Sequence, residues 1–238
     1  AMVCGAIAGS VTALIQTILG VPSILAGIIT NTGLYTVNLM AMGWKSNLSL
    51  LKKDTIFTLF KDLGIGGEYY KLILLGAVVV IVLFLLIIFL HTRLGLSIRA
   101  TGDNRDMIQS SSINPVFTIT VGLAIANSLT GLSGALVGQM QKSADINAGT
   151  GIVVIALACL IIGETVLGKK NISINCIAAI VGSIIYRFIY AIVLKTRIVP
   201  IECLKLLTAF IVVLAISYPT IKANMIINKQ KNAHKRRV

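Results

Sequence analysis

Charged residues are scarce in this chain, and their scarcity excludes an ordinary soluble domain. Asp, Glu, Lys and Arg make up 12% of the 238 residues, whereas soluble domains carry about 25%. The apolar residues, 56% of the chain, are grouped in long runs and do not follow the periodicity of a strand or an amphipathic helix. About 20 consecutive apolar residues suffice to cross a hydrocarbon core as a helix. The composition therefore predicts an all-α, polytopic membrane protein built as a helical bundle.

Residues that hold metals or perform catalysis are also few. The chain has four cysteines and two histidines, and no two cysteines have the CxxC spacing of a metal or redox site. The cysteines fall in or beside apolar runs, as small buried hydrophobic residues do. The sequence also lacks HExxH, GxSxG and Walker motifs, so we expect no metal, no cofactor and no enzymatic activity of its own. The residues in question are Cys4, Cys159, Cys176, Cys203, His91 and His234.

Acidic residues are the rarest charged group, since 8 Asp and Glu stand against 21 Lys and Arg, a net charge of +13. In a soluble protein this excess would suggest nucleic-acid binding. The basic C-terminal segment lacks aromatic platforms and the chain has no nucleic-acid-binding module, so we expect no nucleic-acid partner. We interpret residues 222–238 as a cytoplasmic tail attracted to anionic membrane lipid. Its basic residues are Lys222, Lys229, Lys231, Lys235, Arg236 and Arg237.

The apolar runs predict about seven membrane spans in one transmembrane domain, residues 1–238. No basic region precedes the first run, so it is not a signal peptide, and its start in mid-span suggests that earlier residues are missing. A more polar segment, 43–70, has apolar residues from Leu48 to Leu63 at helical spacing and predicts a short amphipathic helix on the membrane surface. The expected spans are Ala1–Leu19, Ser23–Met42, Lys71–Leu90, Val116–Val137, Gly151–Leu167, Asn175–Leu194 and Leu204–Ile221.

A polar stretch, Gly95–Pro115, separates two of these spans, and we call it the polar island. The positive-inside rule places the basic tail in the cytoplasm. Counting back four spans from the tail then places this island, and also Lys169-Lys170, on the cytoplasmic side. Asp103 is expected to cap a short helix, Asn104–Ser111, and Asn114-Pro115 to start the next span. A short helix of mixed charge suits docking to a soluble partner. The alternative is a long solvated loop.

Polar residues inside spans mark a candidate translocation pathway. The second span carries Thr30–Gly33 and Asn38 at membrane depth, where polar side chains face a protein interior or a water-filled cavity, and the cluster could break the helix. Hydrogen bonding between helices without transport is the alternative. Arg187 is the one cation inside a span; it either snorkels to the outer surface or meets an anionic group of the cargo. The candidate pathway residues are Asn31, Thr32, Asn38 and Arg187.

Glycines recur at spacings typical of helix packing. Gly5 and Gly9 form a GxxxG pair, and Gly131, Gly134 and Gly138 recur in a later span. Such spacings let helix backbones approach closely in lipid. We therefore predict that both sets pack against other helices.

Six segments together share a pattern with a known family. They are Leu25–Ile29, Leu34–Leu39 with Gly43, Gly95–Asn104, Gly131–Ala135, Gly149–Gly151 and Ile162–Glu164. The chain resembles the membrane permease subunits of bacterial ABC importers of the branched-chain amino acid and ribose class. It is most similar to the tryptophan/tyrosine-type and uncharacterised transport permeases among them. The resemblance covers nearly the whole chain and is most specific in the polar island.

The resemblance implies a set of partners in the bacterial plasma membrane. Two permease copies, as a homodimer or a heterodimer, would form the pathway, and a cytoplasmic ABC ATPase would hydrolyse ATP. An extracytoplasmic binding protein would deliver a small solute, an amino acid or a related compound. Chains of this family usually begin with about one more span, which agrees with missing N-terminal residues.

The resemblance also places a coupling helix at about Arg99–Ile113, within a cytoplasmic coupling loop at 93–115, where the ATPase would dock. Two alternatives to an importer permease are a stand-alone secondary transporter or channel, and a structural membrane subunit without a conduit. A secondary transporter would more often place Asp or Glu in mid-span, and none lies clearly there. The coupling residues implied are Arg99, Thr101, Gly102, Asp103, Asn104, Arg105 and Asp106.

Overall fold

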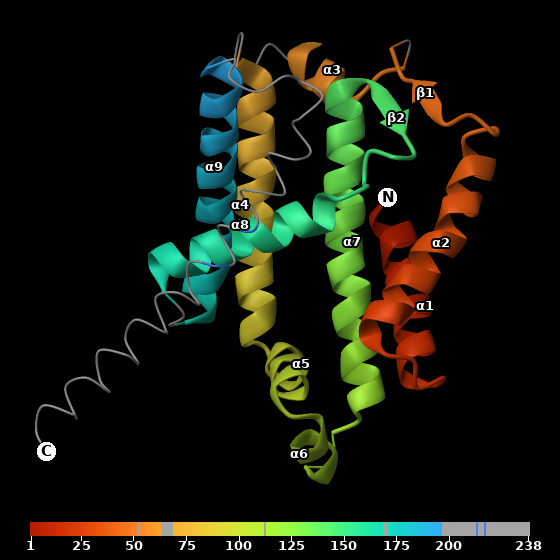
Figure 1. Cartoon of the computed structure of the whole chain (residues 1–238), viewed down its shortest axis with the longest axis vertical. Helices are drawn as coiled ribbons and strands as arrows, with labels where there is room; N and C mark the ends of the chain where they lie inside the picture. The colour runs from red at the N-terminus through yellow and green to blue at the C-terminus, as the bar shows by residue number, and fades with distance from the viewer. Residues whose placement is uncertain are drawn as a thin grey trace, which may run out of the picture. The chain divides into compact units, whose positions relative to one another are not determined.

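The computed structural model describes residues 1–51, 53–62, 69–111, 113–168, 171–196, 213 and 217. The predicted tail 222–238, Lys169-Lys170 and nearly all of the predicted span Leu204–Ile221 lie outside these residues. The elements, in chain order, are α1 (Met2–Thr17), α2 (Ser23–Ala41), β1 (Asn47–Ser49), α3 (Ile56–Asp62), α4 (Tyr70–His91), α5 (Arg93–Asp103), α6 (Arg105–Ser110), α7 (Pro115–Gln141), β2 (Ser143–Asp145), α8 (Ile152–Leu167) and α9 (Ile172–Thr196) (Figure 1).

Long apolar helices dominate the described chain, and they confirm the predicted all-α polytopic architecture. The helices α2, α4, α7 and α9 are long and apolar enough to cross a membrane, and α1 and α8 are shorter apolar helices. Each of the first six predicted spans corresponds to one of these helices, with ends that differ by at most a few residues. No residue of α4 is buried within the described chain, so its apolar surface is free to contact lipid.

The described chain divides into two compact units, Ala1–Ala148 and Gly149–Val238. In the first unit, α1 packs along α7 and also contacts α2. Glycine makes the first contact possible, because a Cβ on Gly9 would collide with the Leu123 carbonyl oxygen and one on Gly5 with that of Asn127. This result confirms the packing predicted for the GxxxG pair.

The second glycine set behaves less uniformly. A Cβ on Gly131 would lie 2.8 Å from the Ala1 carbonyl oxygen, so this glycine also packs against α1. At Gly134 a Cβ would meet no described atom within 4 Å, and at Gly138 its only contact would be an ordinary one of 3.6 Å to the Ser143 carbonyl oxygen. The packing prediction therefore holds for Gly131, while Gly134 has no close neighbour among the described atoms.

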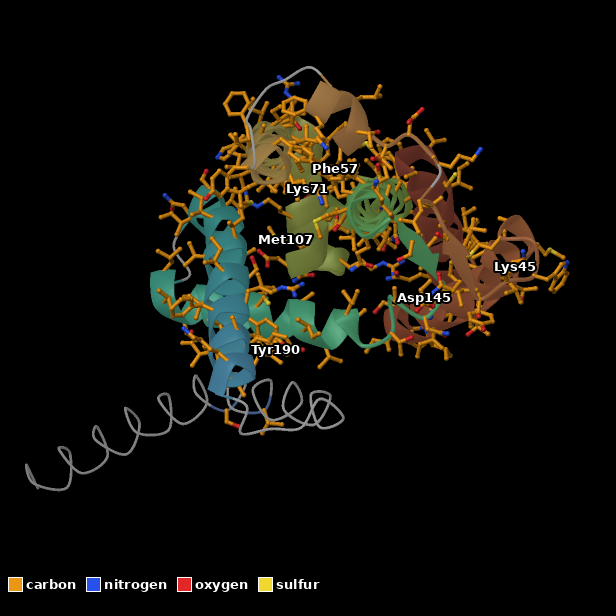
Figure 2. All side chains as sticks on the ribbon, turned by 90° about the horizontal axis from the view of Figure 1, so that it is seen from above. Lys45, Phe57, Lys71, Met107, Asp145 and Tyr190 are labelled. Atoms are coloured by element: carbon orange, nitrogen blue, oxygen red, sulfur yellow. The ribbon has the colours of Figure 1, made fainter. Side chains whose placement is uncertain are left out.

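One end of the first unit carries the small elements α3, β1 and β2, and the opposite end carries α5 and α6 (Figure 1). The strands pair antiparallel, with Leu48 opposite Ala144. The helix α3 packs on α7, where Phe57 is buried and the Ile56 N–H donates to Gln139 Oε1 at 3.1 Å; Figure 2 shows Phe57 beside α7. The predicted surface helix is thus too long, because backbone pairing with β2 makes Leu48 part of a strand.

The second unit is built on a close contact between α8 and α9. A Cβ on Gly163 would collide with the Ala178 carbonyl oxygen, and one on Gly182 with the Cys159 carbonyl oxygen. The two backbones therefore approach each other through a glycine on each side. Beside this contact, Cys159 and Tyr186 form a small apolar core.

The cysteines agree in part with their predicted role as small buried residues. Cys159 is buried and Cys176 is half-buried, and both are free thiols. Cys4 is also free but is exposed, because it lies on the side of α1 that no described element covers. Cys203 lies outside the described residues.

Candidate functional site

The corner between α4 and α5 fixes where the polar island begins. Thr92 is the N-cap of α5, and its hydroxyl accepts a hydrogen bond from the Gly95 N–H at 3.2 Å. A Cβ on Gly95 would collide with the Phe89 carbonyl oxygen and with the backbone of Leu90. Only glycine fits there, so α5 can start directly after α4 and turn back against its end.

One face of α5 is held against α7. The hydroxyl oxygens of Thr101 and Thr118 are 2.9 Å apart, and the exposed fractions of these side chains are 7% and 2%. The Ile98 side chain packs where Gly122 leaves room, since a Cβ on that glycine would lie 3.2 Å from Ile98 Cγ2. This face of the polar island is therefore an internal joint, and Thr101 belongs to it.

The other face of α5 and the start of α6 are open to solvent in the described chain. Of the predicted coupling residues, Thr101 is the buried one, and the Asp106 side chain lies outside the described part of the chain. An apolar side chain that sequence reasoning missed, Met107, is also 66% exposed here. The exposed predicted residues are Arg99, Gly102, Asp103, Asn104 and Arg105.

Of the two caps predicted in the island, one differs from the structure and one agrees with it. Helix α5 runs through Asp103, so the predicted cap at Asp103 is wrong. The chain is extended at Asn104, whose Oδ1 accepts from the Met107 N–H at 3.1 Å and so caps α6. Asn114 Oδ1 accepts from the Val116 N–H at 2.9 Å with Pro115 in the first turn, as predicted for the start of the next span.

A second candidate site is a pocket between α1, α2 and α7, with a volume of about 280 Å³. Its polar lining comes from Thr12 and Gln16 of α1, Ser23, Thr30 and Asn31 of α2, and Asn127 of α7. Gly27, Leu34 and Leu123 complete it. Of the predicted pathway residues on α2, Asn31 lines this pocket, whereas Thr32 and Asn38 are exposed outside its lining.

Helix α2 is continuous through the polar cluster, so the predicted helix break is wrong. The Thr30 hydroxyl donates to the Ala26 carbonyl at 3.0 Å, and the Thr32 hydroxyl donates to the Ile28 carbonyl at 2.9 Å. These hydroxyls bond within their own helix, which removes the need for the backbone to open.

The polar groups of the pocket divide into bonded and available ones. The Thr12 hydroxyl contacts the Ala8 carbonyl and the Thr30 hydroxyl, at 2.9 and 3.0 Å, and Asn127 Nδ2 donates to the Leu123 carbonyl at 3.0 Å. Gln16, Ser23 and Asn31 have no side-chain hydrogen bond to any described residue. Sequence reasoning missed Gln16 and Asn127, although each is an amide within an apolar helix, which is the signal that identified Asn31.

Arg187 belongs to the second unit, where it is exposed on α9 next to the buried Tyr186. Its predicted contact with cargo stays a prediction. Among the described residues, no group of three or more His, Cys, Asp or Glu side chains could hold a metal ion.

Comparison with known proteins adds independent information. A family model described as "Branched-chain amino acid transport system / permease component" matches residues 1–216. The chain is 36% identical over 213 residues to the tyrosine transport system permease protein of Clostridioides difficile (strain R20291), covering 90% of this chain and 69% of that protein. It is 29% identical over 221 residues to an uncharacterized protein of Rickettsia prowazekii (strain Madrid E), covering 91% of this chain and 76% of the relative. No solved structure matches with significance.

Proposed function

We propose, from the premise that the chain belongs to the family of branched-chain amino acid transport system permease components, that it is the membrane subunit of an ATP-driven importer. As a permease of this family it is a multi-pass protein of the bacterial plasma membrane and a component of a transport system. Its partners would be a cytoplasmic ABC ATPase, an extracytoplasmic binding protein and a second permease copy. Because one relative is named a tyrosine transport system permease protein, we take an amino acid as the proposed cargo, with L-tyrosine tested first.

One observation supports the proposal most directly. The polar island has two different faces, a buried face fastened to α7 through Thr101 and an exposed face that carries Arg99, Asp103 and Arg105. A segment that transmits a partner's movement to a membrane helix needs both faces. The exposed charges orient the partner on the segment, and the buried contact keeps the segment from sliding along α7. A merely solvated loop would need neither.

The proposed docking predicts that charge reversal on the exposed face weakens ATPase association. The full-length tagged chain is solubilised from its native cells, and captured ATPase is quantified by mass spectrometry. Arg105→Glu and Asp103→Lys should reduce capture strongly. Lys45→Glu is the control, because this exposed cation lies after α2, at the opposite end of the first unit from α5 and α6, and points outward (Figure 2). Equal capture by all three variants would contradict the docking role.

The energy source separates this proposal from a secondary transporter. Uptake of radiolabelled L-tyrosine in cells should stop when ATP is depleted, and it should persist when an uncoupler collapses the proton gradient while ATP is maintained. The opposite pattern would favour a carrier that uses an ion gradient.

A further inference from the structure

We infer that the pocket between α1, α2 and α7 binds the cargo within the permease itself, and that it accepts a zwitterionic amino acid with an uncharged side chain. The inference rests on the proposed function and adds the site and its selectivity. We call this the amide pocket, after its side chains Gln16, Asn31 and Asn127.

The spacing of the lining residues shows that each of the three helices presents one face to the pocket. Thr12 and Gln16 are four residues apart on α1, and Leu123 and Asn127 are four apart on α7, so each pair lies on one helix face. On α2 the lining residues run from Ser23 to Leu34 at spacings that keep one face. With a rise of about 1.5 Å per residue, Asn31 lies about 12 Å from the start of α2, near the middle of its span.

The chemistry of the lining selects a solute without net charge. None of the described lining residues is Asp, Glu, Lys or Arg, and a charge without a partner at membrane depth costs about 2.5–3.5 kcal/mol on insertion scales. An amide offers both donors and an acceptor. Gln16 and Asn31, which bond to no described residue, can therefore bind the carboxylate and the ammonium group of one zwitterion.

The apolar part and the size of the pocket limit the rest of the solute. Leu34 and Leu123 offer contact to an uncharged side chain. The volume of about 280 Å³ lies just below the range of about 300–1,000 Å³ typical of drug-sized ligands, so a single amino acid suits it better than a peptide or an oligosaccharide.

The same helix connects this pocket to the coupling loop. Thr118, Leu123 and Asn127 all lie on α7, and Thr118 is the residue bonded to α5. A movement of α5 that carries α7 with it would change the wall formed by Leu123 and Asn127. The arrangement links docking of a soluble partner to the shape of the amide pocket.

The first test measures protection from labelling on the full chain alone, in lipid nanodiscs. The native cysteines are replaced by alanine, and either Gly27→Cys, which adds a thiol to the lining without removing a polar group, or Asn38→Cys is introduced. L-Tyrosine, L-leucine and L-serine should slow the reaction of the cysteine at 27 with a methanethiosulfonate reagent, while L-arginine and L-glutamate should not. The cysteine at 38, outside the lining, should react at the same rate with and without each amino acid.

The second test fills the pocket. A Cβ on Gly27 or on Gly33 would meet no described atom within 4 Å, and only Gly27 lines the pocket. Gly27→Leu should therefore abolish uptake of L-tyrosine in cells at equal membrane levels, whereas Gly33→Leu should retain it. Gln16→Ala and Asn127→Ala should each lower the apparent affinity about two- to tenfold, the equivalent of one hydrogen bond.

The outcomes separate this inference from the proposed function. The inference is overturned if no neutral amino acid protects the cysteine at 27, or if arginine and glutamate protect it equally well. A Gly27→Leu variant that transports like Gly33→Leu also overturns it. Protection is measured without an ATPase, so tyrosine uptake that does not depend on ATP would refute the proposed importer and leave the binding result valid.

Discussion

Thr101 of α5 and Thr118 of α7 place their hydroxyl oxygens 2.9 Å apart in a buried contact. Each hydroxyl also contacts a carbonyl of its own helix, that of Ser97 at 2.7 Å and that of Pro115 at 3.0 Å. One hydroxyl can thus donate to a carbonyl while the other donates across the joint. The pair fastens the predicted coupling helix to a membrane helix at one defined point.

Removing either hydroxyl should weaken this joint. Thr101→Val and Thr118→Val keep the side-chain shape and should each lower the free energy of unfolding by about 1 kcal/mol, or the melting temperature in detergent by about 2–4 °C. A double-mutant cycle should give a coupling of about 0.6 kcal/mol and at most about 1.7 kcal/mol, the average and the maximum for hydrogen bonds between membrane helices. Thr120→Val is the control, because it loses only a hydrogen bond to the Val116 carbonyl of its own helix. Strictly additive losses from the two joint variants would mean that the Thr101 and Thr118 hydroxyls do not stabilise each other.

Glycine at 95 should be irreplaceable at the α4–α5 corner. Gly95→Ala forces a methyl group against backbone atoms of Phe89 and Leu90 and should cost about 1–3 kcal/mol. Gly102→Ala on the same helix meets no described atom within 4 Å and should instead stabilise by about 0.5–1 kcal/mol, since alanine is the better helix former. Thermal unfolding of both variants in detergent checks the difference, and equal behaviour would show that the corner can relax.

The contact between α8 and α9 should respond to either of its glycines. Gly163→Ala and Gly182→Ala each push the two backbones apart and should cost about 1–3 kcal/mol. The double variant should cost less than the sum, because the first displacement makes room for the second methyl group. Gly76→Ala on α4, where no described atom lies within 4 Å, should have no such cost, and these four melting temperatures test the packing directly.

Arg187 gives a prediction about transport. If this exposed residue of α9 meets an anionic group of the cargo, Arg187→Gln should reduce tyrosine uptake at least tenfold, the equivalent of about 1.4 kcal/mol, with unchanged membrane insertion. Arg187→Lys keeps the charge and should retain part of the uptake. Unchanged transport by Arg187→Gln would remove this residue from the pathway and leave snorkelling as its role.

Sequence reasoning predicted well those features that depend on neighbouring residues. The spans follow from runs of apolar residues, and the start of α7 follows from Asn114-Pro115. It failed where a distant segment intervenes: Leu48 is in a strand because Ala144 lies opposite. It also failed where two local solutions compete, as when Asn104 instead of Asp103 caps α6.

The candidate sites show the same division. The sequence indicated which types of residue form the sites, because amides and hydroxyls are conspicuous in apolar helices. Their roles were not: Thr101 is a joint, while its neighbours in sequence are exposed, and Asn31 shares a pocket with Gln16 and Asn127 while Thr32 and Asn38 do not.

The amino-acid sequence by itself determined that this chain is a helical, multi-pass membrane protein with a polar segment between two of its membrane-length helices. Transfer of a helix into lipid depends on the length and composition of one continuous segment, and both can be read along the chain. Only the tertiary structure decided which side chains meet. Contacts such as Gly9 with Leu123 and Thr101 with Thr118 join different helices, and they depend on the fit of two packed surfaces, which no single segment contains.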